Sequence, residues 1–196
     1  MIYDISQELF SCHIYPGDPA PERRRLLSMA DGAVCDLSAL SLCAHNGTHV
    51  DAPSHFIPGG PSIDELGLEP FVGPCRVFRH SGELGAGDAA RMLACAGAER
   101  ILIAGPATVT AEAARVFAAA KLRLLGNESQ TVGPEDAPRE VHCILLGAGV
   151  LLLEGLVLDG VPEGRYLLNA APLNLGGCEG SPCRAWLMTE EDAAFA

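Results

Sequence analysis

Four side chains that can bind a metal lie within eleven positions of this chain. They are His45, His49, Asp51 and His55, in the segment HNGTHVDAPSH at residues 45–55. Neutral imidazole and carboxylate are the groups that bind divalent transition metals such as zinc. A glycine and a proline inside the segment interrupt any continuous helix, so a loop is predicted here.

The spacing of these residues favours an open metal site. His49 and Asp51 are two positions apart, so in extended backbone both side chains lie on one face. His45 can join them if the intervening Asn-Gly-Thr turns, which the glycine permits. Three protein ligands leave a position for water, as in catalytic sites, where the metal lowers the pKa of that water to about 7. His55 is either a further ligand or a proton shuttle, because its ordinary pKa is near 6.5.

Two more candidate ligands lie far along the chain in an apolar stretch, VHCILLGAGVLLLEGL at residues 141–156. Glu154 follows four apolar residues, and a buried carboxylate without a partner is costly. A metal would supply that partner, and His142 is the other polar group nearby. The alternatives are that Glu154 lies in water at a strand end or pairs with an arginine. His13 and His80 have no such context and are interpreted as surface or packing residues.

Composition limits the classes of partner. The chain has 196 residues, 48% of them hydrophobic, and a net charge of −12. One domain spanning residues 1–196 is expected, and so acidic a protein would repel nucleic acid. No apolar run approaches the roughly 20 residues of a membrane span, and the N-terminus is a poor signal peptide, so a cytoplasmic protein is expected. Eight scattered cysteines without a C-x-x-C pair are expected to be reduced and mostly buried, with a cysteine zinc site as the alternative.

The apolar pattern alternates between strands and helices in the middle of the chain, which predicts an α/β (α+β) fold with a parallel or mixed sheet covered by helices. The predicted strands are residues 1–6, 33–44, 74–80, 100–105, 123–126, 150–156, 164–173 and 182–188. The predicted helices are residues 87–98, 110–122 and 141–149, with Thr110 as an N-cap.

The histidine segment matches the pattern H-x-G-T-H-x-D-A-P-x-H in full. With the opening YDISQELFSCHIYPGD, the segment VGPCRVF and the closing PLNLGGCEGSPCRAW, the chain resembles the cyclase-like metal-dependent hydrolases that include bacterial kynurenine formamidase. The resemblance implies a swivelling β/β/α domain with a mixed sheet, assembled as a homodimer or a larger homo-oligomer. It also implies zinc or manganese, two ions per chain.

The resemblance assigns roles residue by residue. His55 matches the general acid/base, and Tyr15 takes the place of a pocket-lining aromatic residue in a W-P-G-D turn. Asp51 would bridge the two metals. The ligand sets implied are His45, His49 and Asp51 for the first metal, and Asp51, His142 and Glu154 for the second.

The chain departs from the family pattern away from these residues. The middle, between Ile103 and Leu122, is shorter, the segment 126–133 replaces G-x-D-x-P-S-x-D, and Glu179–Pro182 replaces D-G-S-P. These differences bear on substrate choice rather than on the metal.

The leading hypothesis is a hydrolase of a small amide that uses metal-bound hydroxide, with N-formylkynurenine, and hence tryptophan catabolism, as the default. A cyclic amide, carbamate or lactone would use the same chemistry. The alternatives are a biosynthetic cyclase or dehydratase in which the metal is a Lewis acid, and a metal-binding protein without catalysis.

Overall fold

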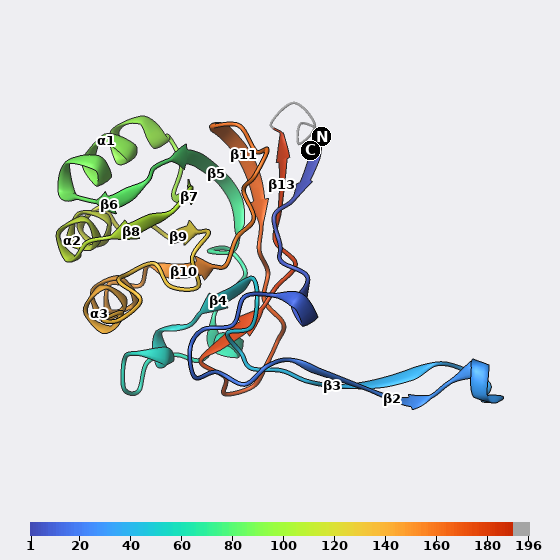
Figure 1. The fold of residues 1–196 in the computed structure, drawn as a ribbon. Coiled ribbons are helices and arrows are strands. Elements are labelled where there is room, and N and C mark those ends of the chain that lie inside the picture. The colour runs from blue at the N-terminus through green and yellow to red at the C-terminus, as the bar shows by residue number, and fades with distance from the viewer. Residues whose placement is uncertain (190–196) are drawn as a thin grey trace.

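The fold is organised around a mixed sheet of nine strands (Figure 1). The structure is a computed structural model, and it describes residues 1–189. In sheet order the strands are β1 (Ile2–Asp4), β13 (Trp186–Thr189), β11 (Gly164–Asn169), β5 (Val72–Arg79), β7 (Arg100–Ala104), β9 (Leu124–Asn127), β10 (Leu151–Glu154), β4 (His49–Asp51) and β12 (Gly180–Pro182).

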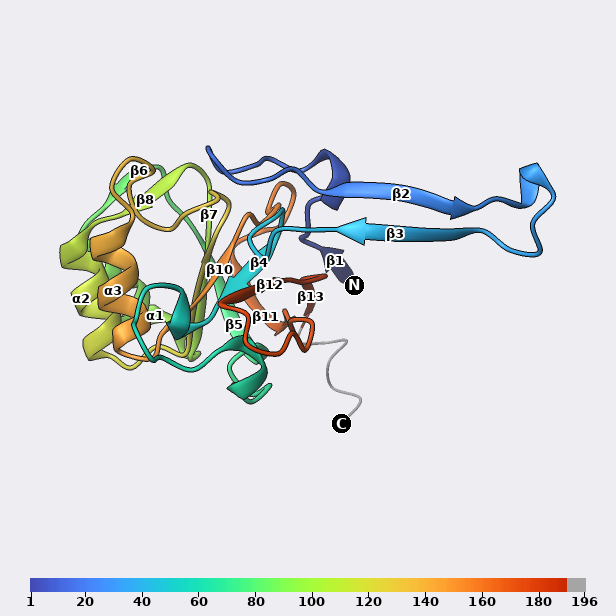
Figure 2. The ribbon, with the colours of Figure 1, turned by 90° about the horizontal axis from the view of Figure 1, so that it is seen from below.

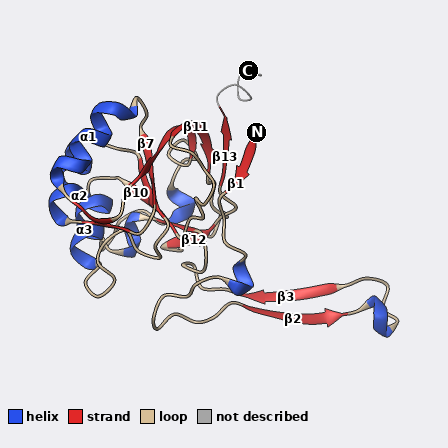
Figure 3. Cartoon of the chain, turned by 45° about the horizontal axis from the view of Figure 1, so that its top comes forward, coloured by secondary structure: helices blue, strands red, loops and turns tan. Residues whose placement is uncertain are grey.

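Four central strands of this sheet, β5, β7, β9 and β10, are parallel, and the remaining pairs are antiparallel. The helices α1 (Ala86–Ala96), α2 (Ala111–Ala119) and α3 (Arg139–Gly147) lie in the three connections between them. All three helices cover the same side of the sheet (Figure 3). Parallel neighbours need crossover connections of this kind. The predicted alternation of strands and helices and the α/β class with a mixed sheet are confirmed.

The central strands are buried on both faces. On β7, Ile101 and Ile103 belong to the core under the helices, whereas Leu102 belongs to a second core on the opposite side of the sheet. On β10, Leu152 faces the helices and Leu153 the second core. Successive side chains on these strands point to opposite faces, and both faces are buried. The strands therefore have continuous apolar sequences instead of alternating ones.

The predicted helices begin close to where their sequence signals lie. Thr110 is the N-cap of α2, and its hydroxyl accepts a hydrogen bond from the backbone N–H of Ala113 over 3.2 Å. At α1 the side chain of Asp88 accepts from the backbone N–H of Gly85 over 3.0 Å. Such caps satisfy N–H groups that have no partner inside the helix.

A two-stranded arm projects from the body of the molecule (Figure 2). It consists of β2 (Glu22–Leu27) and β3 (Leu37–Ser41), which pair with each other in an antiparallel hairpin. The strand expected at residues 33–44 is therefore shorter and lies in the arm. The sequence pattern did not predict β2, because ERRRLL shows no alternation and all six residues are exposed.

Other expectations need correction. Residues 182–188 form the end of β12 and most of β13, with a break between them, instead of one strand. The short strands β6 (Gly82–Leu84) and β8 (Ala107–Val109) pair in parallel and were not predicted. The eight cysteines are free thiols, but Cys75 alone is fully buried and two, Cys35 and Cys95, are exposed. None of the helices within residues 1–189 is long and apolar enough to cross a membrane.

Candidate metal centre and active site

The strand β4 places two of the predicted ligands side by side. His49 and Asp51 point to one face, as their spacing predicted, while Val50 between them is fully buried in the second core. The pairing of β4 with β10 sets His49 opposite Glu154. The segment is thus only partly a loop, because His49–Asp51 is a strand and Pro53–His55 is a 3-10 turn.

The distant residues join this pair as the resemblance implied. Glu154 lies at the carboxyl end of β10, and its Oε2 is 3.5 Å from His49 Nε2. His142 projects from α3, and its Nε2 is 3.2 Å from Glu154 Oε1 and 3.6 Å from Asp51 Oδ2. The two residues therefore meet Asp51 although 91 and 103 positions separate them from it in the sequence.

His45 completes the cluster from the loop before β4. Its Nδ1 lies 3.0 Å from Asp51 Oδ1, and its Nε2 lies 3.4 Å from the half-exposed carboxylate of Glu179. The five residues form two overlapping groups that share Asp51, and within each group one ligand atom per residue lies within 4.8 Å of the others. These groups contain the same residues as the two ligand sets that the resemblance implies.

Backbone carbonyls orient two of the imidazoles. His49 Nδ1 lies 3.0 Å from Gly47 O, and His142 Nδ1 lies 2.8 Å from Pro138 O. A carbonyl only accepts, so in both rings Nδ1 carries the proton and donates it. In the neutral ring Nε2 then has a free lone pair that points toward the carboxylates, as in metal-binding histidines.

The cluster fits a divalent metal on chemical grounds. Asp51 is fully buried, yet neither of its carboxylate oxygens accepts a hydrogen bond from the described residues, and the groups nearest to it are imidazole nitrogens at 3.0 to 3.6 Å. A buried carboxylate without donors is costly unless a cation neutralises it. Two ligand atoms on one tetrahedral zinc are separated by about 3.4 Å. The nitrogen–oxygen distances within the two groups are 3.0 and 3.6 Å around Asp51 in the first and 3.2 and 3.6 Å in the second, close to that value.

Without a metal, protons hold the cluster together. Burial opposes charging of His142, but the hydrogen bond and charge of Glu154 outweigh it and raise the pKa of His142 to about 9. Burial likewise opposes charging of His45, and Asp51 raises its pKa to about 8. Burial would raise the pKa of the Asp51 carboxyl, yet the adjacent histidines outweigh it and lower that pKa. The charged forms of these groups therefore stabilise one another.

His55 lies beside this cluster with different electrostatics. Its ring stacks on the ring of His45 with centroids 4.1 Å apart, and it lies nearly perpendicular to the ring of Phe56. Burial is the largest influence on His55 and lowers its pKa. Near neutral pH the imidazole is therefore uncharged and able to accept a proton.

A pocket of about 170 Å³ opens over the cluster. Tyr15 lines it as expected, and its hydroxyl donates to the backbone carbonyl of Glu135 over 2.6 Å. Other residues that line the pocket were not predicted from the sequence; they are Asp18, Phe56, Gln130, Thr131 and Pro138. Gln130 and Thr131 lie in the 126–133 segment. Its departure from the family pattern was the one feature of the sequence that pointed to these two pocket residues. A larger hollow of about 430 Å³ near Asp4 and Arg184 contains none of the predicted site residues.

Comparison with known proteins identifies the relatives of this chain. A family model described as "Putative cyclase" matches residues 3–102. The kynurenine formamidase of Sphingopyxis alaskensis is 34% identical, over 95% of this chain and 97% of the relative. That of Maricaulis maris is 33% identical, also over 95% and 97%.

Solved structures share the whole fold. A "predicted metal-dependent hydrolase" from Bacillus stearothermophilus superposes with a TM-score of 0.79 at 28% identity, covering 95% of this chain and 97% of that one. Isatin hydrolase A from Labrenzia aggregata superposes with a TM-score of 0.82 at 26% identity, covering 96% and 93%. The fold is that of the cyclase-like metal-dependent hydrolases. The chain belongs to this cyclase family.

Proposed function

We propose that this chain is a metal-dependent hydrolase of a small aryl amide, with an aryl formamide such as N-formylkynurenine as its substrate. The observation that carries the proposal is the cluster of three imidazoles and two carboxylates at an aromatic-lined pocket, with His55 beside it. The kynurenine formamidase relatives, which this chain matches over nearly their full length, support the choice of an amide.

In this proposal the two groups of ligands that share Asp51 would hold two divalent ions, zinc or manganese. The first group adds His45 and His49, and the second adds His142 and Glu154. When bound, such metals polarise a carbonyl and acidify a water molecule, which is the chemistry that amide hydrolysis needs. The nitrogen and oxygen donors suit both metals, so the metal itself must be measured.

His55 moves the proton. Its uncharged imidazole accepts a proton from the attacking water and then donates it to the departing amide nitrogen. Without this proton the nitrogen would have to leave as an anion, which is a poor leaving group. The stacking of His55 on His45 keeps this ring beside the proposed ligands. The walls formed by Phe56 and Tyr15 surround the reacting group with apolar surface, which limits the access of bulk water.

A cyclic aryl amide is the second candidate substrate. Among the residues that line the pocket, none is a lysine or arginine, while Asp18 contributes a carboxylate. No lysine or arginine there would pair with the α-carboxylate of N-formylkynurenine, whereas a neutral ring such as isatin needs no such partner. The similarity to isatin hydrolase A is compatible with this alternative.

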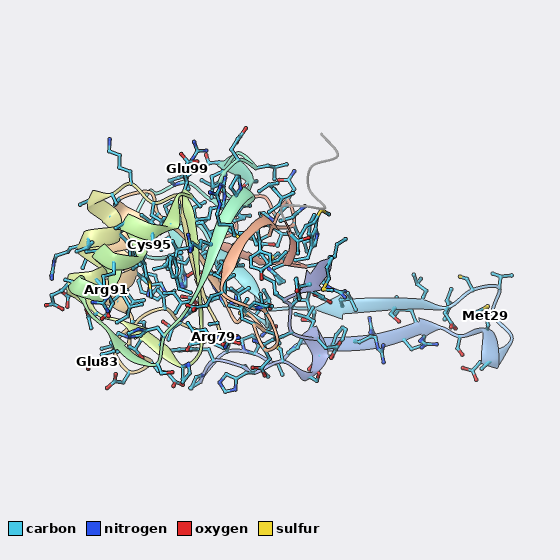
Figure 4. The ribbon with its side chains drawn as sticks, turned by 90° about the horizontal axis from the view of Figure 1, so that it is seen from above. Met29, Arg79, Glu83, Arg91, Cys95 and Glu99 are labelled. Carbon is cyan, nitrogen blue, oxygen red and sulfur yellow. The ribbon has the colours of Figure 1, made fainter. Side chains whose placement is uncertain are left out.

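We also propose that the protein forms a homodimer or larger assembly through the arm. Its apolar side chains are exposed on both strands and at the tip, where Met29 lies (Figure 4). Val34 is 97% exposed, and Leu37 and Leu40 are about half exposed. Such a series on a projecting hairpin is typical of an interface. In analytical ultracentrifugation, a double variant with Val34→Asp and Leu37→Asp should have a lower molecular mass than the wild type. A monomeric wild type would contradict the assembly.

The cytoplasm is the proposed location. All eight cysteines are free thiols, and two of them are exposed. Exposed thiols of this kind persist in reducing compartments. Fractionation of cells that produce the protein would test this assignment.

Turnover of a substrate panel tests the activity. The metal-loaded protein should hydrolyse N-formylkynurenine, formanilide or isatin, and His55→Ala should be much slower on the same compound. Metal binding without turnover of any formamide, cyclic amide or lactone would instead indicate a binding protein. Hydrolysis of lactones alone would keep the mechanism and reject the amide substrate.

A further inference from the structure

The chain contains two glutamines, Gln7 and Gln130, and their side chains hydrogen-bond to each other next to the metal cluster. Gln7 Nε2 donates to Gln130 Oε1 over 3.0 Å, across 123 positions of sequence. We propose that this pair is a clamp that positions His49 for metal binding, so that both glutamines are positioning residues. The inference rests on the proposed function, since it assumes that His49 binds a metal.

The amide of Gln7 has every hydrogen-bonding group in use. Its Nε2 also donates to the carbonyl of Gly155 over 2.9 Å, and its Oε1 accepts from the backbone N–H of His13 over 2.9 Å. Because a carbonyl only accepts and a backbone N–H only donates, the amide can take one orientation alone. In that orientation an N–H must face Gln130.

Gln130 passes this constraint to the metal ligand. With its Oε1 occupied by Gln7, its Nε2 donates to the carbonyl of Gly47 over 3.3 Å. The same carbonyl is the one that receives Nδ1–H of His49. Gln130 therefore holds the group that fixes the ring orientation and tautomer of His49. Outer hydrogen-bond partners of this kind set how well a histidine binds its metal.

The clamp also ties the segment of His49 to the segment of Glu154. Thr48 Oγ1 accepts from the backbone N–H of Gln7 over 2.9 Å and donates to the carbonyl of Gly155 over 2.6 Å. Gly155, directly after Glu154, has a φ of +67°, and a Cβ there would overlap Gln130 Oε1 and the carbonyl of Gly47. Only glycine allows these atoms to converge.

Metal affinity of the purified full-length protein, after removal of metal, tests the clamp. Zinc is titrated against a chromophoric chelator for the wild type, Gln7→Met, Gln130→Met and the double variant. Each single variant should bind zinc about 10–100-fold more weakly, as expected for loss of an outer partner. The double variant should be little weaker than the worse single variant, because the two residues act as one unit.

Ser129→Ala is the matched control. Ser129 precedes Gln130, and its backbone carbonyl, which the substitution retains, accepts from the N–H of Gly155 over 2.8 Å. This variant should bind zinc like the wild type. Zinc affinities within twofold of the wild type for both methionine variants would overturn the clamp. A raised KM with unchanged zinc affinity would also overturn it, and would make Gln130 a substrate contact.

A second measurement separates failure of the clamp from failure of the proposed function. If the wild type binds no divalent metal, the proposed function is wrong, and urea unfolding of the same four metal-free proteins decides the clamp. If the two residues act as one unit, the double substitution should change the equilibrium constant of unfolding by a factor about fivefold smaller than the product of the two factors measured for the single variants. Independent, multiplicative effects would refute it.

Discussion

Binding of metal should release protons, and this prediction follows from the pKa values of the metal-free cluster. His142, with a pKa of about 9, and His45, with a pKa of about 8, are both mostly protonated at pH 7. Each must lose its proton to bind a metal, whereas Asp51 and Glu154 are already ionised because their pKa values are lowered. Saturation at pH 7 should therefore release about two protons per chain.

Metal affinity should depend on pH for the same reason. For His142, two pH units separate pH 7 from its pKa, so protonation should weaken metal binding at its group about 100-fold, or about 3 kcal/mol. Affinity should rise about tenfold per pH unit and level off above pH 9. Calorimetric titration with zinc, repeated in buffers of different ionisation enthalpy, measures both quantities.

A variant provides the control for this experiment. His142→Asn removes one titrating ligand, so the stoichiometry should fall from two ions to one and the release from about two protons to about one. A release below half a proton in the wild type, with an affinity that does not change between pH 6.5 and 9, would refute the reasoning. It would mean that the carboxylates do not hold these imidazoles in the charged form.

Three further predictions concern stability and turnover. In the metal-free protein the folded pKa of His142 lies above the ordinary value of 6.5, so its contribution to stability is complete below pH 6.5 and is lost as pH rises through about 9. Urea unfolding in EDTA should show that the free energy of unfolding falls by about 3 kcal/mol over this range. A free energy of unfolding that rises with pH would contradict this prediction. His55→Ala should retain two metals by elemental analysis and lose about 100-fold or more in kcat, and normal turnover would reject its role as proton carrier. Tyr15→Phe loses the 2.6 Å hydrogen bond to the carbonyl of Glu135 and should raise KM several-fold with a smaller effect on kcat, whereas an unchanged KM would show that this bond does not shape the pocket.

Local signals predicted those parts of the molecule that depend on neighbouring residues. The spacing of His49 and Asp51 placed both on one face because a strand repeats every two residues, and the structure confirms it. The start of α2 at Thr110 follows from the same kind of local chemistry, an N-cap hydroxyl. Glu154 was recognisable because an ionisable side chain in an apolar strand needs a partner.

Features built from distant segments could not be predicted in this way. Nothing near Gln7 in the sequence indicates that it meets Gln130, because the contact depends on distant segments: the bridge between Ser6 and Leu156 and the hydrogen bonds of Gln7 to Thr48 and Gly155. The arm escaped prediction for a different reason. The residues of β2 are exposed on both faces, so no buried side imposes an alternating pattern on Glu22–Leu27.

The central claim is that two metals share Asp51 between the two groups of histidine and carboxylate ligands. Anomalous diffraction from crystals of the zinc-loaded protein, collected on both sides of the zinc absorption edge, tests it most directly. We expect two peaks per chain, one against His45 and His49 and one against His142 and Glu154, both in contact with Asp51. A single peak that does not contact Asp51, or no peak within this cluster, would contradict it.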